Sequence, residues 1–213
     1  MCYSAEASFT AAAVLAVVGI VLVRRFYNSK KIFLALIPLF FGIQQFAEGI
    51  VWIGLKSDSF PTGYSLHAQY LYLFFAEMFW PVWIPLAFAL VEKVFWRRAV
   101  MRLLIVIGLG FFFYAGYNFI VHGVAKALIA GHSINYGPVR LFYRTLYGIV
   151  TMVPFFVSSI RKMWILGIAN VLAFVLASMF YNCAFMSVWC AAAAVLAIGL
   201  LFLLKNSPSA KNP

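Results

Sequence analysis

The chain has 213 residues, of which 66% are hydrophobic and 10% are charged, and its mean hydropathy is +1.00. A soluble globular domain is about half apolar and about a quarter charged, so this composition excludes an ordinary soluble domain. The excess apolar surface has to face lipid. The formal net charge of +11 is also found in nucleic-acid-binding proteins, but in a membrane protein it is typical of basic cytoplasmic loops, and we expect no nucleic-acid partner.

Seven apolar segments are long enough to cross a bilayer, which takes about 20 helical residues. In chain order they run over 7–23, 32–55, 68–91, 103–121, 138–160, 163–181 and 184–204. Because the connections are short, the sequence predicts one all-α domain over 1–204, a bundle of seven transmembrane helices, and a short basic tail over 205–213. The first segment precedes its basic pair, Arg24 and Arg25, which favours a retained anchor over a cleaved signal peptide.

The basic residues predict how the bundle is oriented in the membrane. Twelve of the sixteen Lys and Arg fall in the odd-numbered connections and the tail. They are Arg24, Arg25, Lys30, Lys31, Lys93, Arg97, Arg98, Arg102, Arg161, Lys162, Lys205 and Lys211. Because positive charge stays on the cytoplasmic side, we expect the N-terminus outside and the C-terminus inside, in a bacterial inner (plasma) membrane.

Polar and ionisable residues, which are energetically unfavourable inside a membrane, lie mainly towards the outer ends of the predicted helices. An ionisable group inside a span needs a partner or a function. Glu48 lies about 10 Å below the outer end of the second segment, with Gln44 and Gln45 one turn deeper on the same face. The candidate ligand-binding residues are Glu48, Gln44, Gln45, His132, Tyr136, Arg140, Arg144 and Glu77.

Two other interpretations of these residues stay open. Glu48 and Glu77 could pair with Arg140 and Arg144 and only fix helix packing, since buried ion pairs often act as specificity devices. The donors His122, His132, Glu48 and Cys2 could instead hold a metal ion, although no pair among them has a diagnostic spacing. A disulfide between Cys2 and Cys183 is a further alternative, because both fall on the predicted outer side.

The opening stretch Met-Cys-Tyr-Ser-Ala-Glu-Ala-Ser-Phe, residues 1–9, resembles an uncharacterised family of bacterial multipass membrane proteins that open M-C-[YF]-S-A-x-x-S-F. The stretch over 41–52 and the pair His132 and Tyr136 are similar to that family as well. The resemblance implies an integral membrane protein with no known activity. It also implies that Cys2, Ser4 and Glu48 belong to the family pattern, together with that pair.

We expect the protein to bind a small molecule, a lipid head group or an ion in a polar pocket open to the extracytoplasmic side. One alternative is a membrane-embedded hydrolase, with or without a metal ion, that acts at the outer leaflet. In it the carboxyl of Glu48 or Glu77 is the acid or base, and Arg140 and Arg144 clamp an anionic group. A small-solute transporter is the second alternative, although polar residues thin out towards the cytoplasmic side. The seventh segment has no lysine before Lys205, which excludes a retinal Schiff base.

Overall fold

The computed structural model describes residues 4–57, 59–137, 140–181 and 184–205. Helices make up most of this part of the chain. The helices are α1 (Ala5–Phe26), α2 (Ile32–Ala35), α3 (Ile37–Lys56), α4 (Thr62–Leu73), the π-helix η1 (Phe74–Phe79), α5 (Trp80–Val91), α6 (Phe95–Val121), α7 (Leu141–Val157), α8 (Met163–Phe180) and α9 (Phe185–Lys205). Two short strands, β1 (Leu128–Ala130) and β2 (Ser133–Asn135), lie between α6 and α7.

Several of these elements join end to end, so that the described residues form seven long helical units. α2 continues into α3, and α4 continues through η1 into α5. Six units are long and apolar enough to cross a membrane, whereas α7 has 17 residues. The predicted all-α class of a membrane protein is therefore confirmed at this level.

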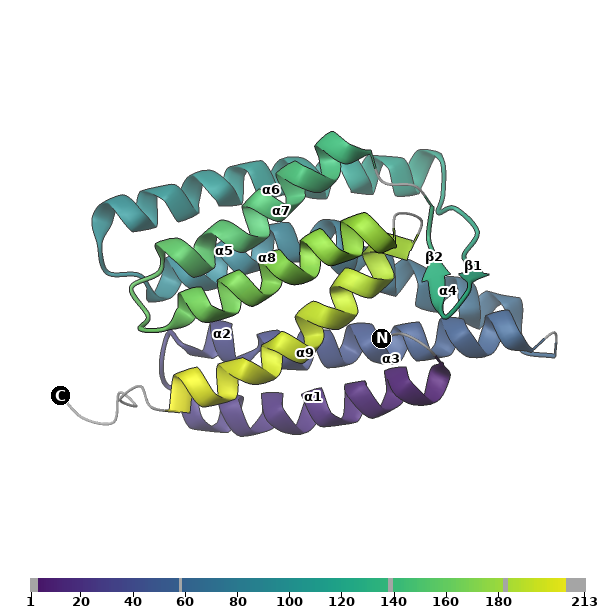
Figure 1. Ribbon diagram of the computed structural model, residues 1–213, viewed down its shortest axis with the longest axis horizontal. Coiled ribbons are helices and arrows are strands. Elements are labelled where there is room, and N and C mark those ends of the chain that lie inside the picture. The colour runs from purple at the N-terminus through teal and green to yellow at the C-terminus, as the bar shows by residue number, and fades with distance from the viewer. Residues whose placement is uncertain (1–3, 58, 138–139, 182–183, 206–213) are drawn as a thin grey trace.

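The units run side by side along the long axis of the molecule (Figure 1). At one end lie the connections 27–31, 92–94 and 158–162 together with the end of α9. At the opposite end lie the start of α1, the connection between α3 and α4, and the hairpin. We call the first of these the basic end, because the basic residues of 24–31, 93–102 and 161–162 lie there, and the opposite one the hairpin end.

The hairpin adds two strands to the otherwise helical part of the chain that the structure describes. Ala130 pairs with Ser133 across a two-residue turn, and Gly131 adopts a φ of +61° that favours glycine. Ile134 is fully buried, and the hairpin contributes it to an apolar cluster with Trp52, Tyr72 and Met186. The sequence stretch 122–137 therefore covers one end of the bundle rather than forming an open loop.

Candidate functional site

A buried polar cluster lies inside the hairpin end of the bundle, centred on Glu48. One carboxylate oxygen of Glu48 accepts a hydrogen bond from the Ser187 hydroxyl at 2.7 Å. The other accepts a hydrogen bond from Nε2 of Gln45 at 3.2 Å. Next to them, Nε1 of Trp80 donates to Oε1 of Gln44 at 2.7 Å. We call these four residues and Trp80 the Glu48 cluster; it ties α3 to α5 and α9.

Helix geometry explains why the sequence brings these groups together. Gln44, Gln45 and Glu48 are three and four residues apart, so they lie on one face of α3, as predicted. Exposed fractions of 0% for Gln44, 2% for Gln45 and 0% for Glu48 show that this face points into the bundle. Ser187 from the first turn of α9 is also fully buried. A buried carboxyl needs such donors, because an unsatisfied polar group costs about 1–3 kcal/mol.

Aromatic side chains lie between the Glu48 cluster and the hairpin. The rings of Tyr72 and Tyr136 stack with centroids 4.6 Å apart, and the Tyr72 hydroxyl donates to the carbonyl of Met186. Tyr136, which follows β2, is 8% exposed. Tyr136 thus lies close to the Glu48 cluster, but as part of the apolar cluster over it. Glu48 is enclosed by protein instead of lining an open surface.

Arg144 and Arg140 have different environments although they are one helical turn apart. Arg144 is 7% exposed, and its guanidinium lies over the ring of Phe185 with 4.9 Å between Cζ and the ring centroid. Arg140 directly precedes α7 and is exposed. Arg144 of α7 is therefore a buried cation that packs against the first residue of α9, whereas Arg140 lies on the surface.

The predicted metal donors are spread out. His122 ends α6 and His132 lies at the tip of the hairpin, and both side chains are exposed. Within the described ranges, no three His, Cys, Asp or Glu side chains are close enough to hold a metal ion. Cys2 and Cys183 lie outside the described residues, and so does the disulfide considered between them.

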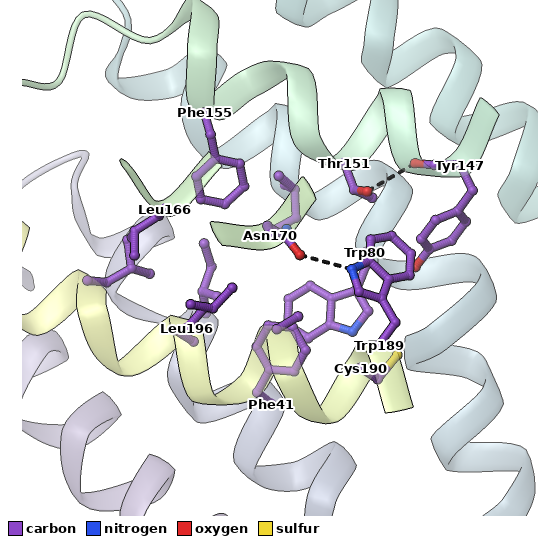
Figure 2. A pocket seen from close by; sticks show the side chains of 15 residues that line it. Phe41, Trp80, Tyr147, Thr151, Phe155, Leu166, Asn170, Trp189, Cys190 and Leu196 are labelled. Atoms are coloured by element: carbon purple, nitrogen blue, oxygen red, sulfur yellow. Dashed lines mark hydrogen bonds between the residues drawn. The ribbon is translucent and has the colours of Figure 1, made fainter. Parts of the chain in front are cut away.

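A cavity of about 50 Å³ adjoins the Glu48 cluster and extends towards the basic end. It lies between α3, α5, α7, α8 and α9 (Figure 2). Trp80, Tyr147 and Cys190 lie at one end of it, and Phe155 and Leu166 lie at the other. Its lining residues are Ile37, Phe41, Trp80, Ile84, Tyr147, Thr151, Phe155, Leu166, Asn170, Trp189, Cys190, Ala193, Leu196, Ala197 and Leu200.

Most polar groups of the cavity wall are already hydrogen-bonded. Nε1 of Trp189 donates to Oδ1 of Asn170 at 2.9 Å, and the Thr151 hydroxyl donates to the carbonyl of Tyr147 at 3.0 Å. The Tyr147 hydroxyl donates to the carbonyl of Ala76. The remaining wall is aromatic and aliphatic, so the cavity offers an apolar contact surface with a polar end.

The cavity connects to the Glu48 cluster through two shared side chains. Trp80 lines the cavity and donates to Gln44. Cys190 also lines it and lies beside Gln44 and Tyr72. Nε2 of Gln44 is buried and has no hydrogen-bond partner among the described residues. The polar Glu48 cluster and the apolar cavity are thus in direct contact through Trp80 and Cys190.

None of the eight ligand-binding residues predicted from the sequence lines this cavity. The prediction weighed charged and amide groups, whereas the cavity is built from aromatic and small side chains. A signal was present in α9, where Trp189, Ala193, Ala197 and Leu200 recur every three or four residues along one face. That pattern alone cannot be distinguished from ordinary core packing.

The fold and the interior together define an all-α membrane protein with a buried polar centre and an adjoining apolar cavity. The chain belongs to the family of unknown function DUF6629, whose model matches residues 1–213. The resemblance to an uncharacterised family is thereby confirmed. No curated protein and no solved structure matched the chain.

Proposed function

We propose that this protein binds a small, largely apolar molecule, or one apolar chain of a lipid, in the cavity beneath the Glu48 cluster. The observation that carries the proposal is the cavity itself, with its aromatic walls and a polar end at Trp80, where it adjoins the Glu48 cluster. Ligand sites are mostly apolar and have a few placed polar groups that orient the ligand. A void of about 50 Å³ takes only a short apolar segment, such as the end of a chain, and an apolar void favours such a guest over water.

The Glu48 cluster supports this function by fixing the polar end of the cavity. Trp80 is held through Gln44, and Ser187 holds the start of α9 against Glu48. A ligand therefore meets pre-organised side chains, which lowers the entropy cost of binding. In this proposal Glu48 positions the site and does not contact the ligand.

Photolabelling tests the proposal. The protein in lipid vesicles is irradiated with a fatty acid that bears a diazirine near the end of its chain, and labelled peptides are mapped. We expect adducts on the cavity face of α9, around Ala193 and Leu196. Ala193→Leu, which fills the cavity, should remove these adducts. Ala192→Leu is the matched control, because Ala192 is also partly buried on α9 but does not line the cavity.

Two results would count against cavity binding. One is labelling confined to the outer faces of the helices, and the other is labelling of α9 that Ala193→Leu leaves unchanged.

We further propose that the bundle crosses a bacterial inner membrane seven times, with the N-terminus outside. Support comes from the basic residues of three connections, which lie together at one end of the bundle, as positive-inside orientation requires. The proposal adds α7, the fifth helical unit in chain order, to the six longer ones, and its 17 residues span about 26 Å. Arg140, which directly precedes α7 and is exposed, can reach the interface with its long stem.

A further inference from the structure

Glu77 occupies the centre of the longest helical unit, which runs from Thr62 to Val91 through α4, η1 and α5. The side chain is partly exposed. It makes no hydrogen bond and no ion pair with any residue that the structure describes, in contrast to Glu48. At mid-bilayer depth a lone carboxylate is costly, so its charge has to be neutralised by a proton or by a cation.

α7 packs against the helical unit beside this carboxyl, because the Tyr147 hydroxyl donates to the carbonyl of Ala76, the residue before Glu77. Tyr143 lies close enough to Glu77 and to Tyr114 to interact with both electrostatically. The Tyr143 hydroxyl is buried and has no hydrogen-bond partner among the described residues. Phe111 packs edge-on against the Tyr143 ring, with centroids 4.7 Å apart. Tyr143 precedes Tyr147 by one helical turn, so two polar groups without a hydrogen-bond partner among the described residues, the Glu77 carboxyl and the Tyr143 hydroxyl, lie near each other, with aromatic rings beside Tyr143.

The backbone at Glu77 is also irregular. Residues 74–79 form a π-helix, which closes with the N–H of Trp80 on the carbonyl of Phe75, five residues earlier. Pro81 follows, and it cannot donate the α-helical hydrogen bond to the carbonyl of Glu77. Single π-turns inside α-helices often occur at functional sites. Here the π-turn carries the one acidic residue of its helical unit.

We propose that Glu77 and Tyr143 form a binding site for a lipophilic amine that enters from the bilayer. The neutral amine takes the proton of the Glu77 carboxyl, and the resulting ammonium is held by the carboxylate. No electrons are transferred, and the proton moves from oxygen to nitrogen. The Tyr143 hydroxyl donates to the carboxylate in this state and satisfies its own hydrogen-bonding capacity.

The surroundings select a cation of this kind. A carboxylate provides only acceptors, and aromatic rings such as Tyr143 attract a positive charge to their faces through the ring quadrupole. Carboxylates and aromatic faces together are how proteins bind organic ammonium groups. Because neither Glu77 nor Tyr143 lines the cavity, this site is independent of the ligand proposed there.

A hydrophobic carbodiimide tests the site, since it couples to protonated carboxyls in apolar surroundings. The protein in lipid vesicles is treated with dicyclohexylcarbodiimide, with and without the lipophilic tertiary amine dibucaine, and adducts are mapped by mass spectrometry. We expect an adduct at Glu77 that dibucaine prevents and that Glu77→Gln abolishes. Glu48 is an internal control, because it is fully buried and should stay unmodified.

Tyr143→Phe distinguishes an amine-binding site at Glu77 and Tyr143 from a Glu77 carboxyl that is only accessible to the carbodiimide. The variant should keep the Glu77 adduct, but protection should need at least about tenfold more dibucaine, because a hydrogen bond to a charged group is lost. Tyr117→Phe, an exposed tyrosine on α6, should behave as wild type. An absent Glu77 adduct, equal labelling of Glu48, or unchanged protection in Tyr143→Phe would each overturn the inference.

Discussion

At the scale of single residues, Glu92 is the acid whose role the structure defines most fully. One of its oxygens accepts hydrogen bonds from the N–H groups of Lys93 and Val94 at 2.9 and 3.0 Å and from the Ser159 hydroxyl at 2.7 Å. The other accepts from the N–H of Ser159 at 2.8 Å. Its carbonyl accepts from the Arg98 guanidinium. This one side chain therefore joins the connection before α6 to the connection before α8 at the basic end.

Glu92→Gln should destabilise the protein by about 1–3 kcal/mol at neutral pH, because the amide N–H₂ of glutamine would face N–H donors. Burial raises the pKa of the Glu92 carboxyl, but the hydrogen bonds from Val94, Ser159 and Lys93 outweigh burial and hold it below its ordinary value of 4.5. A lowered folded pKa means that this stabilisation is complete above about pH 4.5 and is lost as the pH falls through the folded pKa. Denaturant unfolding in detergent at pH 7 and at pH 3–4 measures both effects.

Ser159→Ala is the graded control for Glu92→Gln. It removes only the hydroxyl donor and keeps the N–H of residue 159, so we expect a smaller loss at pH 7. If Glu92→Gln unfolds like wild type at pH 7, Glu92 does not hold the two connections together.

Glu48 and Glu92 show what the sequence can reveal about single residues. The spacing of Gln44, Gln45 and Glu48 predicts that they share a face of one helix, and the structure has them so. Glu92 carries no comparable signal, since it stands beside Lys93 in a basic stretch. Its partner Ser159 is 67 residues away, and such a distant pair follows only from the packing of the helices.

At the scale of elements, the close approach of α5 and α6 depends on a proline and a glycine. Pro85 has no N–H, so the carbonyl of Pro81 receives no α-helical hydrogen bond from it. Gly108 of α6 packs directly on that carbonyl: a Cβ atom at Gly108 would lie 2.1 Å from the oxygen. Small residues allow membrane helices this close contact, which adds van der Waals attraction.

Gly108→Ala should therefore force α6 away from α5 and lower the free energy of unfolding by about 1–3 kcal/mol. Gly110→Ala is the matched control in the same helix, because a Cβ there meets no atom within 4 Å. Alanine favours helix more than glycine does, so Gly110→Ala should be neutral or stabilising by up to about 1 kcal/mol. Equal thermal stability of the two variants in detergent would show that the contact does not matter.

Long apolar helices follow directly from the sequence, but short irregular elements do not. The apolar segments of the sequence predict the bounds of every long helical unit to within several residues. The largest differences are at α6 and α4, which begin at Phe95 and Thr62, before the apolar segments that predict them. Arg97, Arg98 and Arg102 fit inside α6 because a helix can extend past the bilayer. The hairpin and η1 depend on tertiary contacts and on Pro81, and hydropathy carries no information about them.

At the scale of the whole molecule, the two ends of the bundle differ in chemistry. The basic end holds the clustered Lys and Arg and the connections that Glu92 joins. The hairpin end is closed by aromatic and apolar side chains, and the polar interior lies beneath them. The sequence predicts the difference between the two ends from the number of Lys and Arg residues in the connections on each side. It does not predict that the polar groups are enclosed, because enclosure depends on the hairpin.

The proposed seven crossings depend on α7, which has 17 residues and is the shortest of the seven helical units in the described part of the chain. His132 at the hairpin tip and Arg161 after α7 are both exposed and flank this helix. In a chain whose native cysteines are replaced by serine, His132→Cys should react with a membrane-impermeant maleimide in intact cells. Arg161→Cys should react only after the membrane is permeabilised, because charge bias places it in the cytoplasm.

The pattern of labelling separates the two parts of that proposal. The opposite pattern would reverse the orientation but keep α7 as a crossing. Equal labelling of both cysteines in intact cells would place the two flanks of α7 on one side. The helix would then be a re-entrant or interfacial segment, and an apolar length of 17 residues would be too short to cross in this bundle.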